Sequence, residues 1–146
     1  MHSDPDIAAV LEQLVRVVRR MATAGDLGLP AAAVLARLDR AGPQRLTDLA
    51  AAEGISQPGT TQLVTRLERD GLVRRTPSPD DGRVVLVAVT DDGRALVERR
   101  RDERSQTLTA LLDRLDPAER DAVERALPAL AHLADLALDR TRGVPA

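Results

Sequence analysis

Small side chains, most of them able to hydrogen-bond to nucleic-acid bases, are concentrated in one short segment near the middle of the chain. They are Ser56, Gln57, Pro58, Thr61, Gln62 and Thr65. If the segment is helical, they share one side of the helix, with Gln57 at its edge. The other side carries Thr60, Leu63, Val64 and Leu67. Short hydroxyls and amides let a helix approach base edges closely, and Gln can pair bidentately with adenine. The pattern predicts a helix that presents a polar face to the DNA major groove.

Arginines at the end of this segment and after it could neutralise DNA phosphates. They are Arg66, Arg69, Arg74, Arg75 and Arg83. The chain has no lysine, so every cationic contact is made by a guanidinium, which can donate two parallel hydrogen bonds to phosphate oxygens. Acidic residues between positions 53 and 81 cancel this charge, so DNA affinity depends on where each side chain points. Hairpin arginines are commonly just solvated, but the position after the polar helix favours a DNA contact, most of all for Arg83.

The composition excludes several other classes of function. The 146-residue chain has no Cys, Phe, Tyr or Trp, which removes thiol chemistry, Cys-ligated zinc and aromatic stacking of single-stranded bases. Nucleophile–base pairs, paired carboxylates and phosphate-binding glycine loops are not evident, so we expect no enzymatic activity and no cofactor. His132 has no second His nearby, so we expect no metal site.

The spacing of apolar residues predicts the elements that must position these side chains. The predicted helices cover 4–25, 30–42, 46–54, 56–70, 91–115 and 117–142, and the predicted strands cover 72–76 and 83–89. We expect Thr47 and Ser56 to cap the third and fourth helices and Gly54 to turn the chain between them. The segment 77–82, whose Asp81-Gly82 ending is a hairpin-turn signal, should join the two strands. The fold class is therefore mainly α with a small β-hairpin, in the order of a winged helix-turn-helix.

The terminal helices carry more apolar surface than one small domain needs to cover. We expect Asp4 to cap the first of them. The candidate dimer contacts are Ile7, Leu11, Leu14, Leu130 and Leu133. By contrast, no apolar side chain occurs from Glu98 to Thr107, where arginines alternate with acids. We interpret that stretch as a solvated helix face that bridges two packed regions, and not as a second DNA contact.

Several stretches resemble the DNA-binding region of MarR-type transcriptional regulators. The helix-turn-helix is matched by GISQP (54–58) and LVTRLERDGLVRR (63–75), and the wing and the start of the long helix by DDGR (80–83) and VTDDG (89–93). With the flanking helices, the resemblance covers essentially the whole chain. It implies a homodimer on double-stranded DNA, most often a repressor, that binds a palindromic operator.

The resemblance also implies that different segments of a single chain, 1–146, have different functions. It assigns 30–90 to the winged helix-turn-helix, 4–25 and 91–142 to dimerisation, the helix 56–70 to the major groove, and the wing 74–85 to the minor groove or backbone. By the family pattern, Arg83 is the wing-tip residue and Asp81 is the partner that orients it. Gln62 stands where the family often has arginine, which favours adenine over a phosphate or guanine contact there.

A small-molecule effector is a further expectation from the resemblance, although its identity is open. A pocket between the first, second and fifth helices would be lined by Leu, Val, Met, Arg and Ala. This lining suits an apolar or anionic effector; the alternative is that the protein has no effector. The alternative function is a winged helix used only for protein–protein contact, against which the Thr/Gln/Arg character of the fourth helix argues. The chain lacks a signal-peptide pattern and a membrane-length apolar run, so we expect a cytoplasmic protein with no membrane partner.

Overall fold

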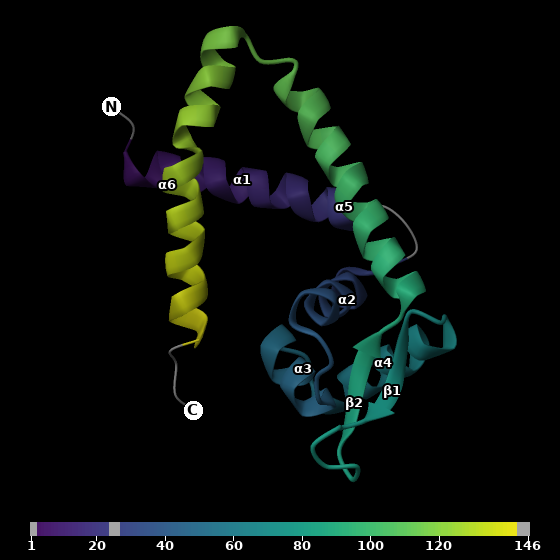
Figure 1. Cartoon of the computed structure of the whole chain (residues 1–146). Helices are drawn as coiled ribbons and strands as arrows, with labels where there is room; N and C mark the ends of the chain where they lie inside the picture. Colours follow the sequence, from purple (N-terminus) through teal and green to yellow (C-terminus); the bar gives the residue numbers. More distant parts are fainter. Residues whose placement is uncertain (1–2, 24–26, 143–146) are drawn as a thin grey trace. The chain divides into compact units, whose positions relative to one another are not determined.

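The computed structural model describes residues 3–23 and 27–142, which form six helices and a two-stranded hairpin (Figure 1). The elements are α1 (Asp4–Thr23), α2 (Leu29–Ala41), α3 (Leu46–Glu53), α4 (Gln57–Arg69), β1 (Val73–Pro77), β2 (Val85–Val89), α5 (Asp91–Leu112) and α6 (Pro117–Arg142). Two compact units, Met1–Arg104 and Ser105–Ala146, divide the chain within the polar stretch of α5. Within the described ranges, no helix is long and apolar enough to cross a membrane.

The core of the first unit lies between α2, α3, α4 and the hairpin. Its fully buried apolar side chains are Val34, Leu35, Leu38, Leu49, Val64, Leu67, Val73 and Val87. Burying each such side chain stabilises the fold by about 1.5–3 kcal/mol. In α4, Thr60, Val64 and Leu67 are buried, as the sequence predicts. This packing fixes the rotation of α4 and leaves its polar face outward.

The turn between α3 and α4 has the predicted chemistry, but the predicted cap of α3 is wrong. Gly54 is left-handed with φ 63°, and its N–H donates to the Ala50 carbonyl. The Ser56 hydroxyl accepts a hydrogen bond from the Gly59 N–H at 3.2 Å. Helix α3 instead begins at Leu46 with Arg45 as an extended N-cap that makes no side-chain cap bond. The helix starts at Leu46, as predicted, so Thr47 lies in the first turn of α3 and not before it.

The strands pair antiparallel, with Val73 opposite Val89 and Pro77 opposite Val85. A connection is predicted at 77–82, and the structure has a seven-residue loop, 78–84, that overlaps it; Gly82 has no positive φ. Two internal bonds close this loop, from the Ser78 N–H to the Val84 carbonyl and from the Val84 N–H to the Asp81 carbonyl. The loop begins one residue later than predicted, because Pro77 pairs with Val85 as the last residue of β1.

A third segment joins the hairpin through a single residue. The Gln44 N–H donates to the Val87 carbonyl at 3.0 Å, and the Val87 N–H donates to the Gln44 carbonyl at 2.8 Å. The Arg37 Nε donates to the Gln44 side-chain oxygen at 2.8 Å, and Arg37 also lies 4.0 Å from Glu53. These contacts tie α2 and α3 to β2, so the helix-turn-helix and the hairpin are held together.

Thr90 and Gly93 fasten the start of α5 to the end of α4, and Thr90 caps α5 as predicted. The Thr90 N–H donates to the Leu72 carbonyl at 3.0 Å, and its hydroxyl donates to the Gly71 carbonyl at 2.6 Å. The same hydroxyl accepts the Gly93 N–H at 3.1 Å. A Cβ on Gly93 would lie 2.2 Å from the Leu72 oxygen, so only glycine permits this approach.

Helix α1 is capped by Ser3, so the predicted Asp4 cap is wrong by one residue. The Ser3 carbonyl accepts the N–H groups of Asp6 and Ile7. In return, the Asp6 carboxylate accepts the Ser3 N–H at 3.1 Å and the Ser3 hydroxyl at 2.7 Å. The hydroxyl bond and then the backbone bond lower the pKa of Asp6. The predicted helix end at Gly25 lies outside the described residues.

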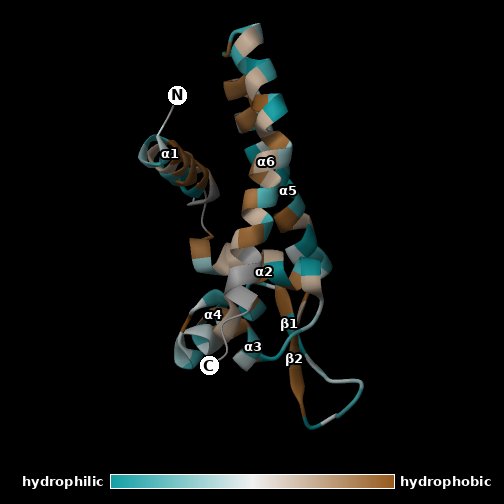
Figure 2. Cartoon of the chain, turned by 90° about the vertical axis from the view of Figure 1, so that its left-hand side faces the viewer, coloured by the Kyte–Doolittle hydropathy of each residue, from teal (hydrophilic) through white to brown (hydrophobic). Residues whose placement is uncertain are grey.

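The second unit contains the end of α5 and all the described part of α6. A reciprocal capping box starts α6: the Asp116 N–H donates to Glu119 at 3.0 Å, and the Glu119 N–H donates to Asp116 at 2.9 Å. Apolar residues recur along α6 and are exposed (Figure 2). They are Val123, Leu127, Leu130, Leu133 and Leu136. Helix α1 of the first unit likewise exposes Ile7 and Leu14, whereas Leu11 is half-buried.

Candidate nucleic-acid interface

The outward side of α4 brings together all the polar residues that the sequence predicts to face DNA. Ser56, Gln57, Pro58, Thr61, Gln62, Thr65, Arg66 and Arg69 are all exposed. Burial of the opposite side by the core sets this orientation, and the Ser56 cap sets the point at which the helix begins. The face carries two amides, two arginines and three small hydroxyl residues, which suits the close approach of a helix to base edges.

The threonine hydroxyls on this face already have acceptors within the helix. Thr61 donates to the Gln57 carbonyl at 3.0 Å, and Thr65 donates to the Thr61 carbonyl at 2.8 Å. Their protons are therefore engaged, and the side-chain amides of Gln57 and Gln62 are the groups on this face that offer both a donor and an acceptor. These amides are the residues best suited to bidentate contacts with adenine.

The arginines at the end of α4 lie close to Asp70. Arg66 lies 4.0 Å and Arg69 lies 3.4 Å from the Asp70 carboxylate, and the three side chains are largely exposed. Exposed pairs of this kind contribute about 0–1 kcal/mol. A DNA phosphate could therefore compete with Asp70 for the Arg69 guanidinium at little cost.

The hairpin presents Arg74 on β1 and Arg83 in the loop, and both side chains are exposed (Figure 2 shows the loop as hydrophilic). The Asp81 carboxylate accepts the Arg83 backbone N–H at 3.0 Å. Asp81 thus shapes the loop through the main chain, which is the turn chemistry that Asp favours. Any influence of Asp81 on the direction of the Arg83 guanidinium is through this backbone contact.

Arg75 differs from Arg66 and Arg69 because its guanidinium pairs with a residue of another element. It forms an ion pair with Glu68, and its second amino group donates to the Thr65 hydroxyl at 3.2 Å. The Arg75 backbone N–H also donates to Glu68 at 3.3 Å. Glu68 did not stand out in the sequence, where it only offsets arginine charge. The feature that could have indicated this pairing is the position of Glu68. It lies one helical turn after Thr65 and seven residues before Arg75.

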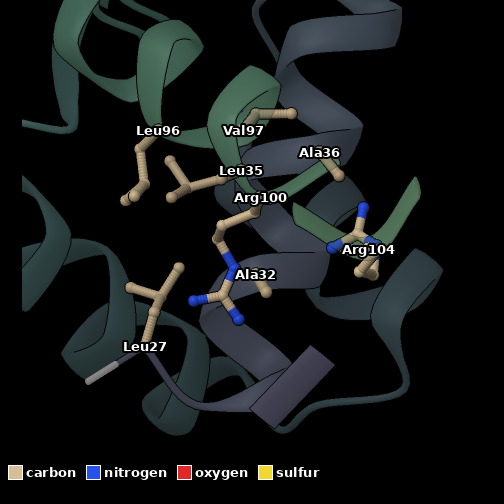
Figure 3. Close-up of a pocket in the computed structure, with 8 residues that line it drawn as sticks. All are labelled: Leu27, Ala32, Leu35, Ala36, Leu96, Val97, Arg100 and Arg104. Carbon is tan, nitrogen blue, oxygen red and sulfur yellow. The ribbon is translucent and has the colours of Figure 1, made fainter. Parts of the chain in front are cut away.

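A small pocket lies between α2 and the beginning of α5. It is lined by Leu27, Ala32, Leu35, Ala36, Leu96, Val97, Arg100 and Arg104. Figure 3 shows the Arg100 guanidinium between Leu27 and Ala32. The interpretation of the 98–107 stretch as uniformly solvated is wrong for Arg100 and Arg104, which are half-buried because they lie one and two helical turns beyond Leu96 on the same face. The cavity volume is about 20 Å³, enough for one water molecule.

Comparisons with known proteins agree with this arrangement. The family model "MarR family" matches residues 27–85. The chain is 31% identical over 130 residues to an uncharacterized HTH-type transcriptional regulator of Mycobacterium bovis, covering 89% of this chain and 91% of that protein. Among solved structures, RV1404 of Mycobacterium tuberculosis has a TM-score of 0.77 at 27% identity, covering 90% of this chain and 94% of that chain.

A second solved structure is that of BpsR from Bordetella bronchiseptica, whose DNA binding is regulated by 6-hydroxynicotinic acid. It has a TM-score of 0.57 at 27% identity, and the match covers 90% of this chain and 96% of that chain. The family model spans the segment from just before α2 to the start of β2, where the candidate DNA contacts lie. The chain therefore belongs to the MarR family of helix-turn-helix transcriptional regulators and is a DNA-binding regulator of transcription.

Proposed function

We propose that this protein is a dimeric repressor that reads a palindromic operator and responds to a small molecule. The polar face of α4 carries the proposal: its exposed side chains and the outward arginines of the hairpin belong to the same packed unit. In this arrangement α4 reads base edges in the major groove, while Arg74 and Arg83 reach the backbone or the minor groove. Residues 30–90 form the DNA-binding region of each copy.

Dimerisation is proposed through residues 4–25 and 91–142. Ile7 and Leu14 on α1 are 51% and 54% exposed, and Leu130 and Leu133 on α6 are 41% and 49% exposed. Side chains of this kind are the ones that a second copy would cover, with the half-buried Leu11 at the edge of the contact. Two recognition helices related by a two-fold axis would read half-sites whose centres lie about 10 bp apart.

The effector is proposed to be an apolar carboxylate or a similar anion. Arg100 and Arg104 supply positive charge beside an otherwise apolar pocket that includes Leu35 and Val97. The BpsR effector is by its name a carboxylic acid, which matches this chemistry. A cavity of about 20 Å³ is far below the roughly 300 Å³ or more of ligand sites, so binding requires α2 and the first turns of α5 to separate.

A protein-binding module without specific DNA contact is the second candidate, but no observation favours it. Such a surface should be apolar at its centre, whereas the outward face of α4 carries threonines, glutamines and arginines. The relatives named above are regulators, which supports a non-enzymatic role for this chain.

A titration of purified protein against DNA upstream of its own gene tests the proposal. Fluorescence anisotropy at fixed salt should give a lower Kd for that fragment than for a scrambled one. Arg83→Ala should weaken binding by at least about tenfold and lower the salt slope by about two, because each copy in the dimer loses one guanidinium contact. The control is Arg101→Ala, which removes an exposed arginine of α5 outside the interface. Equal affinity for the two fragments would rule out specific regulation at that site.

A further inference from the structure

We propose that Arg75 is a positioning residue, not a phosphate ligand: with Glu68 and Thr65 it fixes the angle between the recognition helix α4 and the wing. The inference rests on the proposed function, because it concerns how the same surface meets DNA. By this inference Glu68 favours DNA binding, although it is an acidic residue on a DNA-binding helix.

The contacts join the two elements through both main chain and side chain. The Glu68 carboxylate accepts the Arg75 backbone N–H at 3.3 Å and pairs with the Arg75 guanidinium. The guanidinium also donates to the Thr65 hydroxyl at 3.2 Å, and that hydroxyl donates to the Thr61 carbonyl at 2.8 Å. A continuous set of bonds therefore runs from β1 to two successive turns of α4.

The strand register places Arg75 on the inner side of the hairpin. Side chains alternate along a strand, so Arg75 shares the face of the buried Val73, and its cross-strand partner Val87 is also buried. Its side chain is 31% exposed. Arg74 has the opposite orientation and is exposed. The two neighbouring arginines therefore differ in what they can reach.

Moving Arg75 to a phosphate would carry a specific cost. The Glu68 side chain is 36% exposed, and losing its partner would leave a partly desolvated carboxylate close to the DNA phosphates. The same movement would release the Thr65 hydroxyl and the bond that aligns α4 with β1. Functional groups that contact a ligand need supporting bonds of this kind to hold their geometry. DNA binding therefore benefits more from an Arg75 that stays on Glu68.

The sign of the effect of Glu68→Gln distinguishes positioning from phosphate contact. If Arg75 is a phosphate ligand restrained by Glu68, removing the acid frees the guanidinium and strengthens DNA binding. If Arg75 positions α4, Glu68→Gln and Arg75→Gln each weaken binding to the upstream duplex by about fivefold to tenfold, and the double variant is no weaker than either single one. Exchange of the pair, Glu68→Arg with Arg75→Glu, should recover part of the affinity.

The salt dependence of the Kd gives a second readout, with Arg74→Gln as the reference for a phosphate contact. Arg74→Gln should lower the salt slope by about two, one for each copy in the dimer, and Arg75→Gln should leave it unchanged. An Arg75→Gln variant with the same loss of slope as Arg74→Gln, or a Glu68→Gln variant that binds DNA more tightly, would overturn the proposal.

A measurement without DNA separates this inference from the proposed function. Because the chain has no cysteine, spin labels can be placed at cysteines introduced for the exposed Gln62 on α4 and Val85 on β2. The distance distribution between the labels should broaden in Glu68→Gln and Arg75→Gln, but not in Arg74→Gln. An unchanged distribution in the first two variants contradicts the positioning role. If the wild-type protein binds the upstream duplex no more tightly than a scrambled one, the proposed function is contradicted instead.

Discussion

Gly93 is the residue whose identity the packing restricts most strongly. The first turn of α5 lies against the Leu72 carbonyl, and an added Cβ would also approach a Val89 methyl group to 2.6 Å. We predict that Gly93→Ala lowers the free energy of unfolding by about 1–3 kcal/mol, because the backbone must shift to relieve the overlap. Gly82→Ala is the matched control, since nothing lies within 4 Å of a Cβ there and its φ is not positive. Equal melting temperatures for the two variants would show that the junction tolerates a side chain.

Arginine illustrates why residue type alone does not define a role in this protein. Arg83 is exposed in the wing loop, Arg75 is paired inside the interface, and Arg100 lines a pocket. The sequence predicted phosphate contacts for Arg83 and Arg75 alike, because their partners lie seven or more residues away or in the loop backbone. The different roles of Arg83 and Arg75 become visible only from the strand register and from the position of Glu68 on α4.

The N-terminus of α4 allows stability and DNA binding to be changed independently. The Ser56 hydroxyl caps the helix through the Gly59 N–H, and Ser56 is also a predicted DNA contact. Ser56→Ala should lower the free energy of unfolding by about 1 kcal/mol. Ser56→Asp should retain the cap, and thus the melting temperature, while its negative charge repels DNA phosphates. Thermal unfolding and anisotropy on both variants check this; an Asp variant that binds DNA as tightly as wild type would remove the N-terminus of α4 from the interface.

At the level of elements, the sequence predicted those with a periodic pattern or a strong cap. The helices, the Gly54 turn and the Thr90 start of α5 have such signals, and all are confirmed. The bridge through Gln44 was missed because one bridging residue has no periodicity. The connection between the strands was predicted at 77–82 and lies at 78–84, because Pro77 still pairs with Val85 at the end of β1.

For the whole molecule, the exposed apolar faces of α1 and α6 predict a dimer. Light scattering at micromolar concentration should return twice the 15.7 kDa mass of the chain. Leu130→Arg together with Leu133→Arg should shift the protein toward monomer, because charge replaces apolar surface that a partner would bury. The control is Asp135→Arg, an exposed residue that lies five and two positions after the two leucines and therefore on the opposite side of α6. If light scattering shows that the wild-type protein is a monomer, the predicted dimer and the predicted palindromic site are both contradicted.

Selection of operators from a random-sequence DNA pool with the purified wild-type protein tests the central claim most directly. The account predicts enrichment of an inverted repeat with half-site centres about 10 bp apart, and adenine at positions contacted by Gln57 or Gln62. Gln62→Ala should relax the preference at one position of each half-site and leave the others unchanged. A pool that stays random after repeated rounds at moderate salt would contradict the account, because α4 would then not be reading DNA sequence.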